Sequence, residues 1–202
     1  MRKPVKFIFD LDGTVTAEET LPLIAKHFHI QAEIDSITKE TIQGNIPFVE
    51  SFIKRVQILG ELPVSEVSSL LGKVNLYPQL YRFIQENNTH CIIASGNLSC
   101  WVDKLIEKIG CSAFCSEAIM ENDKIVKLTK ILRKELVVEK FQRSGYEVVY
   151  IGDGNNDLEA MRTADIAIAV GMTHYPSKSL LPVSDYVIFN EKALCRQLNQ
   201  LL

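Results

Sequence analysis

The sequence lacks any long apolar stretch: no run approaches the roughly 18 residues that a membrane-spanning helix requires. It also lacks an excess of basic charge, because its formal net charge is −3, its pI is about 5.8 and no lysine-rich run occurs. The five cysteines are odd in number and form no CxxC pair. These absences argue against a membrane partner, a nucleic-acid partner and a disulfide-stabilised or zinc-binding fold.

A cleavable leader is not apparent either. The N-terminus, MRKPVKFIFD, begins with basic residues as a signal peptide does, but Asp10 interrupts the apolar region that should follow. We therefore expect a cytoplasmic protein whose cysteines are reduced and mostly fill the core.

The most distinctive stretch is FIFDLDGT at residues 7–14. Its apolar half predicts a buried strand that ends in the carboxylates Asp10 and Asp12, after which Gly13 permits a sharp turn and Thr14 offers a hydroxyl. In parallel α/β sheets, ligands bind at the carboxyl ends of the strands. Two carboxylates crowded there repel each other and are costly to bury unless a cation lies between them.

The hydrophobic pattern predicts the fold class. Apolar residues at helical spacing predict four helices, over 18–28, 30–43, 47–59 and 65–71. From Pro78 onward strands alternate with helices: strands over 90–94, 147–151, 166–170 and 186–189, helices over 79–87, 98–109, 130–144, 158–163 and 192–201, and a hairpin over 118–126. We expect an α/β fold with a doubly wound parallel sheet. Residues 1–14 and 76–202 would form this core, and residues 15–75 a small helical cap inserted after the first strand.

Two later strands of the pattern also end in polar residues. Ser95 follows the second strand, and the stretch GDGNND carries Asp153 and Asp157 after another. If these strands neighbour the first one, their polar ends share one crevice with Asp10 and Asp12. An all-oxygen site with several carboxylates selects a hard cation, most simply Mg²⁺. GDGNND fails as a calcium loop, which requires a glycine at 158 and a glutamate at 164.

At this point the sequence resembles a known family. DLDGT, the strand-ending SG of Ser95 and Gly96, a downstream lysine and GDGNND resemble the four motifs of the haloacid dehalogenase superfamily of phosphohydrolases. The lysine is best assigned to Lys134, which stands 19 residues before Asp153 as in the phosphoserine phosphatase branch. Other candidates for this lysine are Lys127, Lys130 and Lys140.

The resemblance implies a role for each motif residue. Asp10 would be the nucleophile that forms an aspartyl-phosphate, and Asp12 the general acid and base. Asp10, Asp153 and the backbone carbonyl of Asp12 would hold Mg²⁺. Phosphate binding would fall to Ser95, Gly96, Lys134 and Asn156. Asp157 would orient a metal-bound water or the lysine, although a plain helix N-cap is an equally good interpretation of Asp157 and Asn156.

The predicted cap resembles that of the phosphoserine phosphatases. Glu19 and Arg55 stand where that branch binds the substrate ammonium and carboxylate, and Phe48 matches an aromatic residue that closes over the site. The alternative is that Glu19 and Arg55 are ordinary exposed helix charges. The sequence also departs from the branch, with Asn97 in place of a glycine, Gly13 in place of a serine, and a short segment between 118 and 134.

These observations predict a Mg²⁺-dependent phosphomonoesterase that acts through an aspartyl-phosphate, on phosphoserine or a similar small phosphorylated metabolite. Such an enzyme would serve serine biosynthesis as a monomer or homodimer. Because fold and motifs do not determine a substrate, three alternatives stay open. They are a phosphatase of another metabolite such as a methionine-salvage enediol phosphate, a phosphoserine:homoserine phosphotransferase, and a phosphate-sensing or scaffold protein on a hydrolase fold.

Overall fold

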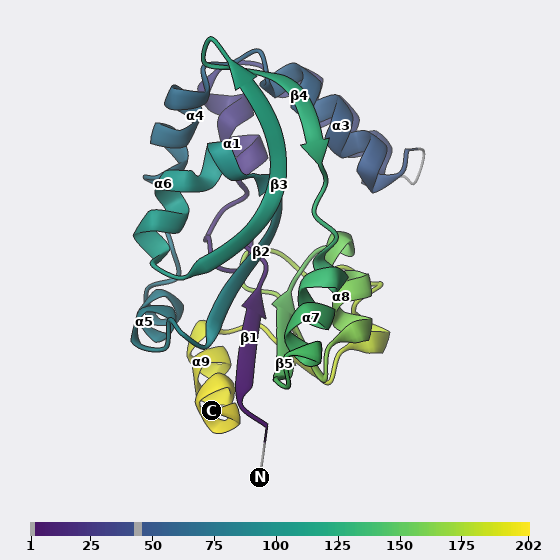
Figure 1. Ribbon diagram of the computed structural model, residues 1–202. Helices are drawn as coiled ribbons and strands as arrows, with labels where there is room; N and C mark the ends of the chain where they lie inside the picture. Colours follow the sequence, from purple (N-terminus) through teal and green to yellow (C-terminus); the bar gives the residue numbers. More distant parts are fainter. Residues whose placement is uncertain (1–2, 43–45) are drawn as a thin grey trace.

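A seven-stranded sheet forms the centre of the computed structural model, which describes residues 3–42 and 46–202 (Figure 1). The strand order is β4-β3-β2-β1-β5-β6-β7, and every neighbouring pair is parallel except β3 and β4. The strands are β1 (Val5–Phe9), β2 (Cys91–Leu98), β3 (Ser112–Glu121), β4 (Lys124–Lys130), β5 (Glu147–Gly152), β6 (Ile166–Val170) and β7 (Tyr186–Ile188).

Both faces of the sheet are covered by helices, which is why the strands are apolar on both sides. Phe7 and Phe9 of β1 pack in one buried cluster, whereas Ile8 between them packs in the other. The first cluster includes side chains from α5 (Pro78–Glu86), α6 (Ser99–Ile109) and α9 (Glu191–Leu201). The second includes side chains from α7 (Lys134–Arg143) and α8 (Leu158–Thr163). The predicted doubly wound α/β fold is confirmed.

Four helices lie between β1 and α5, beyond the carboxyl end of β1 and away from both termini (Figure 1). They are α1 (Thr20–His27), α2 (Gln31–Ile42), α3 (Phe48–Leu59) and α4 (Val64–Leu71). The chain enters and leaves this group along adjacent segments, because Thr16 forms a β-bridge with Leu76 and the Ala17 N–H donates to the Asn75 carbonyl at 2.9 Å. The last residue of the helix expected over 30–43 lies outside the described residues.

The β3–β4 hairpin is longer than the sequence pattern predicts. Residues 112–116 of β3 pair with β2, and the rest of β3 pairs with β4 and extends to the helices beyond the sheet. At the tip, the Asp123 carbonyl accepts from the Val64 N–H at 2.8 Å, and the Asp123 carboxylate accepts from the Ser65 N–H at 2.9 Å. The hairpin therefore satisfies backbone donors at the start of α4 that a helix cannot satisfy internally.

The helix expected over 130–144 begins later, at Lys134. Residues 124–130 (KIVKLTK) continue the hairpin ladder instead, because they pair with residues 117–121 of β3, and Ile125 and Leu128 pack against the first buried cluster. The described residues also include two short 3₁₀ helices, Asn155–Asp157 and Leu181–Val183. Among the described residues, no helix has the length and apolar character needed to cross a membrane.

Candidate functional site

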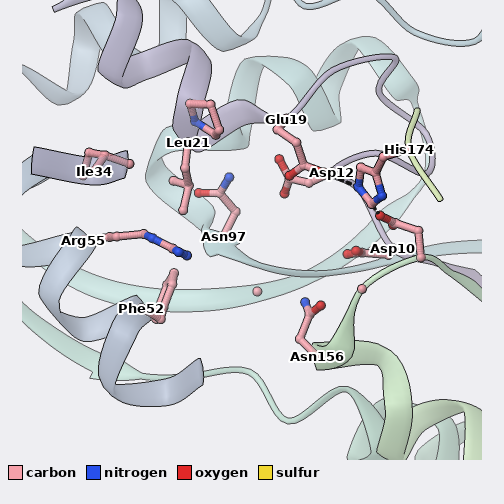
Figure 2. A pocket seen from close by; sticks show the side chains of 14 residues that line it. Asp10, Asp12, Glu19, Leu21, Ile34, Phe52, Arg55, Asn97, Asn156 and His174 are labelled. Carbon is pink, nitrogen blue, oxygen red and sulfur yellow. Dashed lines mark hydrogen bonds and ion pairs between the residues drawn. The ribbon is translucent and has the colours of Figure 1, made fainter. Parts of the chain in front are cut away.

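Three adjacent strands bring the predicted site residues together. β1 lies between β2 and β5, so Asp10 after β1, Ser95 in β2 and Asp153 after β5 meet at one edge of the sheet. Asp10 and Asp153 border a cavity of about 450 Å³ between the sheet and the helices that follow β1 (Figure 2), whereas Ser95 is fully buried beside it. Its lining comprises Asp10, Asp12, Glu19, Leu21, Pro22, Ile34, Phe52, Arg55, Gly96, Asn97, Asp153, Gly154, Asn156 and His174.

Lys134 places a buried positive charge at this edge of the sheet. Its Nζ lies 2.6 Å from an oxygen of Asp10 and 2.6 Å from an oxygen of Asp157. Burial alone would lower the pKa of Lys134, but the two carboxylates raise it above its ordinary value, so the ammonium stays charged. The pKa of Asp10 is raised by burial and by repulsion from Asp157, against the opposing effect of Lys134. Of the four candidate lysines, Lys134 is the one that contacts Asp10.

Asp157 is fully buried, and both of its oxygens are already occupied by donors. Oδ1 accepts from the Lys134 ammonium at 2.6 Å and from the Tyr150 hydroxyl at 2.7 Å. Oδ2 accepts from the backbone N–H groups of Asp153 at 3.1 Å and Gly154 at 2.9 Å. A carboxylate with four such donors orients the lysine and the following loop, and it has little capacity left to ligate a cation. Its contact with Lys134 is the one that the orienting interpretation expects, whereas its side chain makes no N-cap hydrogen bond to α8, the helix that follows.

Asp10 and Asp153 offer the better donor set for a metal ion. Oxygens of Asp10, Asp153 and Asp157 all lie within 4.8 Å of one another. Asp153 is held by Thr14, whose hydroxyl donates to Oδ1 at 2.7 Å. Lys134 contacts two of these carboxylates and His174 contacts Asp153, but with Asp12 and Glu19 nearby the acidic groups at this edge still outnumber the basic ones, and a divalent cation with oxygen ligands would offset this negative charge. The residues present therefore fit a hard divalent cation.

Asp12 is held from one side by Thr20. The Thr20 N–H donates to Asp12 Oδ1 at 3.1 Å, and the Thr20 hydroxyl donates to the same oxygen. Burial raises the pKa of Asp12, and these two hydrogen bonds from Thr20 oppose the rise. Because the carboxyl group also borders the cavity, it can exchange a proton with a bound molecule.

β2 continues past Ser95, which the sequence pattern placed after the strand, and the part of β2 that contains Gly96 is linked to the segment before Lys134. The Ser116 hydroxyl donates to the Gly96 carbonyl at 2.7 Å and accepts from the Leu132 N–H at 3.0 Å. Ser95 is fully buried, and its Oγ accepts from the Asn97 N–H at 3.1 Å. A Cβ atom on Gly96 would lie 3.8 Å from the Asn156 amide nitrogen, so these two predicted phosphate-binding residues lie close together where both border the cavity.

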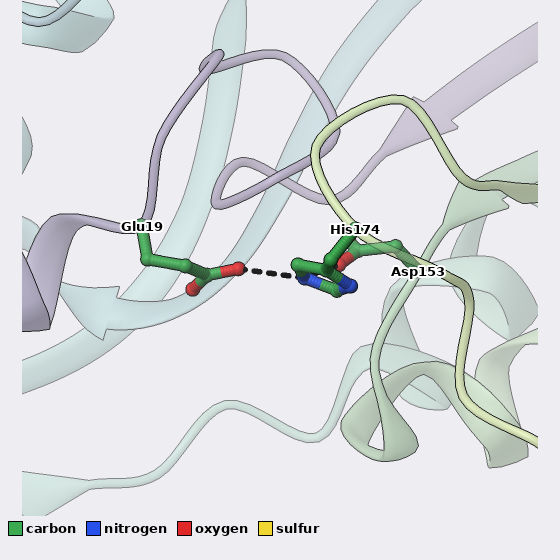
Figure 3. Close-up of side chains that lie close together, drawn as sticks. All are labelled: Glu19, Asp153 and His174. Atoms are coloured by element: carbon green, nitrogen blue, oxygen red, sulfur yellow. Dashed lines mark hydrogen bonds and ion pairs between the residues drawn. The ribbon is translucent and has the colours of Figure 1, made fainter. Parts of the chain in front are cut away.

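His174 belongs to the site, although the sequence pattern does not single it out. Its Nε2 lies 2.9 Å from Glu19 Oε1 and 2.9 Å from Asp153 Oδ2, so it bridges the first helix after β1 and the end of β5 (Figure 3). Hydrogen bonding to Asp153 raises the pKa of His174 to about 10. Burial and the charges of Asp12 and Asp153 raise the pKa of Glu19 to about 7, against the effect of His174. The sequence signal that could have identified His174 is its position shortly after β6, because β6 neighbours β5 in the sheet.

The opposite wall of the cavity is apolar and carries Arg55. Arg55 points into the cavity from α3, facing the carboxylates (Figure 2). Burial lowers its pKa, and the charge of Glu19 counteracts this. The surrounding side chains, which the motifs did not predict, are Leu21, Pro22, Ile34 and Phe52. The side chain of Phe48, the predicted closing aromatic, lies outside the described side chains.

Known proteins resemble this chain over most of its length. A family model described as haloacid dehalogenase-like hydrolase matches residues 7–165. The phosphoserine phosphatase of Methanocaldococcus jannaschii is 30% identical over 183 residues, which cover 84% of this chain and 87% of that protein. The phosphoserine phosphatase of Archaeoglobus fulgidus is 29% identical over 175 residues, which cover 80% of this chain but 51% of that longer protein.

The fold is also found among solved structures. A phosphoserine phosphatase solved as an analogue of its phospho-aspartyl intermediate matches with a TM-score of 0.81 at 26% identity, and the match covers 100% of both chains. The region matched by the family model contains the strand-end residues described above from Asp10 to Asp157, whereas His174 lies beyond it.

The four donors around Asp157 predict unequal effects of two substitutions. Asp157→Asn leaves one carbonyl oxygen for four donors, so we expect the free energy of unfolding to fall by about 2–4 kcal/mol. Tyr150→Phe removes one donor, and we expect a fall of about 1 kcal/mol. Urea unfolding of both variants measures this. Equal losses in the two variants would contradict the arrangement.

Proposed function

The chain belongs to the haloacid dehalogenase-like hydrolases and is a phosphoric monoester hydrolase, and we propose that its substrate is phosphoserine. The observation that supports the reaction best is the contact of Lys134 with both Asp10 and Asp157 at the end of β1, since it holds a nucleophile and a phosphate-binding cation side by side. We also propose that residues 15–75 form a cap that covers this edge of the sheet.

In the proposed first step, an oxygen of Asp10 bonds to phosphorus while the bond from phosphorus to the ester oxygen breaks. The ester oxygen keeps the electron pair and takes a proton from Asp12. The product on the enzyme is an aspartyl-phosphate at Asp10. A related phosphoserine phosphatase has been solved as an analogue of such an intermediate, which supports this assignment.

In the second step, a water oxygen bonds to the phosphorus of the aspartyl-phosphate as the bond to Asp10 breaks. Asp12, now ionised, takes the proton of the water, and orthophosphate leaves. The Ser95 hydroxyl, the Gly96 N–H, the Lys134 ammonium and the Asn156 amide would donate to the phosphoryl oxygens, where negative charge is concentrated.

Asp10, Asp153 and the backbone carbonyl of Asp12 would hold Mg²⁺, which when bound would neutralise the crowded carboxylates and polarise a phosphoryl oxygen. Thr14 orients Asp153 for this purpose through its 2.7 Å hydrogen bond. Asp157 keeps Lys134 directed at Asp10. Such supporting contacts determine how accurately the reacting groups are positioned.

The substrate assignment rests on the other half of the cavity. Arg55 would bind the substrate carboxylate, for which its planar guanidinium is suited, and Glu19 would bind the ammonium. Phe48 would close over the bound molecule. The names of the related enzymes support phosphoserine over other small phosphomonoesters. A substrate without these charges would not form the interactions with Arg55 and Glu19, which disfavours its binding.

Orthophosphate release in the presence of Mg²⁺ tests the function. We expect phosphoserine to give the highest kcat/KM among phosphoserine, phosphothreonine, phosphoethanolamine and a set of sugar phosphates. Asp10→Asn should lower kcat by at least about a thousandfold, because the nucleophile is lost. Preference for sugar phosphates would contradict the substrate, and surviving Asp10→Asn activity would contradict the nucleophile. Phosphohomoserine formed on addition of homoserine would instead indicate a phosphotransferase.

Arg55→Ala tests the carboxylate site. We expect KM for phosphoserine to rise about 10- to 100-fold, the value of a charge-assisted hydrogen bond, while p-nitrophenyl phosphate, which has no carboxylate, is hydrolysed nearly as before. Lys54→Ala is the matched control on the same helix, because Lys54 pairs with Glu50 at an exposed position. If Arg55→Ala impairs both substrates alike, Arg55 has a structural role.

A further inference from the structure

A chain of buried hydrogen bonds ends on Asp12 and is not explained by the reaction steps above. Thr20 donates to Asp12 Oδ1 through both its N–H and its hydroxyl. The Asn97 side-chain nitrogen in turn lies 2.7 Å from the Thr20 hydroxyl oxygen. Thr20 is fully buried and Asn97 is 4% exposed, so these hydrogen bonds are largely shielded from bulk water.

The direction of each hydrogen bond in this chain is determined by a backbone group. The Leu98 N–H lies 2.9 Å from Asn97 Oδ1 and can only donate, which identifies that atom as the amide oxygen. The amide NH₂ therefore faces Thr20 and donates to its hydroxyl oxygen. Because the hydroxyl has a single proton, that proton is directed at Asp12 Oδ1.

Asp12 Oδ1 consequently accepts two hydrogen bonds from Thr20, and we expect both to persist through the reaction. A carboxyl proton on Oδ1 would point at the hydrogens of these two donors, and the backbone N–H cannot turn away. The proton of the acid form therefore belongs on the second oxygen, Oδ2. Asp12 and Asn97 both border the cavity in which the ester would lie (Figure 2).

We propose that Thr20 and Asn97 are positioning residues that confine the proton transfers of Asp12 to Oδ2. The proposal rests on the proposed function, in which Asp12 is the general acid and base. When the ester bond breaks, the Oδ2 proton moves to the leaving oxygen, and when water attacks, the water proton moves to Oδ2. Oδ1 remains a hydrogen-bond acceptor throughout.

Asn97 is the residue at which this sequence departs from the glycine that the phosphoserine phosphatase resemblance implies. Glycine has no side chain to donate to Thr20. The departure thus has a physical reason in this chain, because the amide determines which way the Thr20 hydroxyl points.

The leaving group of the substrate gives the test. An alkoxide must be protonated as it leaves, whereas p-nitrophenolate is stable without a proton. We expect Thr20→Val to lower kcat/KM for phosphoserine by about 10- to 100-fold and kcat/KM for p-nitrophenyl phosphate by less than about threefold. Thr20→Ser, which keeps the hydroxyl, should restore both values. This parameter reports the steps up to aspartyl-phosphate formation, in which Asp12 acts as the acid.

Asn97→Ala is the second variant, which removes the amide donor that faces Thr20 without adding a charge to the cavity. The Thr20 hydroxyl would then no longer be held toward Asp12, and a smaller selective loss on phosphoserine is expected. Thr163→Val is the matched control, since its hydroxyl donates to the Glu159 carbonyl at 2.7 Å on α8, remote from the cavity. We expect the kcat/KM values of Thr163→Val for both substrates to equal those of the unmodified protein.

The ratio of the two kcat/KM values is measured on one preparation, so a partly unfolded variant does not change it. Equal losses on the two substrates, or a valine variant as active as the serine variant, would overturn the proposal. If the unmodified protein hydrolyses p-nitrophenyl phosphate but not phosphoserine, the substrate assignment fails, and the comparison uses the alkyl phosphate that it hydrolyses best. If the unmodified protein hydrolyses neither substrate, both the proposed function and this inference are contradicted.

Discussion

Electrostatic repulsion among buried carboxylates is the constraint on which the rest of the structure depends. Asp10, Asp153 and Asp157 place oxygens within 4.8 Å of one another, and two unit charges about 4 Å apart repel by roughly 4 kcal/mol at an effective dielectric constant of 20. Lys134 compensates part of this charge by contacting two of the three groups, and His174 contacts the third, Asp153. Because Asp12 and Glu19 lie at the same edge, acidic groups still outnumber basic ones there, which favours a ligand that brings positive charge.

The fold brings these charged side chains together, and hydrogen bonds hold them in place. The strand order places β2, β1 and β5 side by side, so residues far apart in the sequence converge at one sheet edge. Hydrogen bonds then connect these segments: Thr14 holds Asp153, Asp157 holds Lys134, and Ser116 connects the end of β2 to the segment before Lys134. Each carboxylate at this edge thereby acquires a distinct environment, which is how chemically identical groups can take different roles.

The sequence predicts the sheet and its strand-end residues well, because these depend on local patterns. An apolar run followed by Asp10 or Asp153 identifies a strand and its end without any knowledge of tertiary structure. His174 was missed because its partners, Glu19 and Asp153, are distant in sequence and belong to other elements. The late start of α7 was missed for a related reason, since β4 continues only because β3 pairs with it. The Asn97–Thr20 contact likewise joins two elements whose proximity no local pattern reveals.

The central claim is that a divalent cation binds between Asp10 and Asp153, two of the buried carboxylates whose oxygens lie within 4.8 Å of one another. Anomalous diffraction from crystals of the protein soaked in Mn²⁺, a redox-stable substitute for Mg²⁺ with similar oxygen-ligand preference, tests it most directly. The account predicts a strong anomalous peak in contact with carboxylate oxygens of Asp10 and Asp153. A peak between Glu19 and His174 with none at Asp10, or no peak at this edge of the sheet, would contradict it.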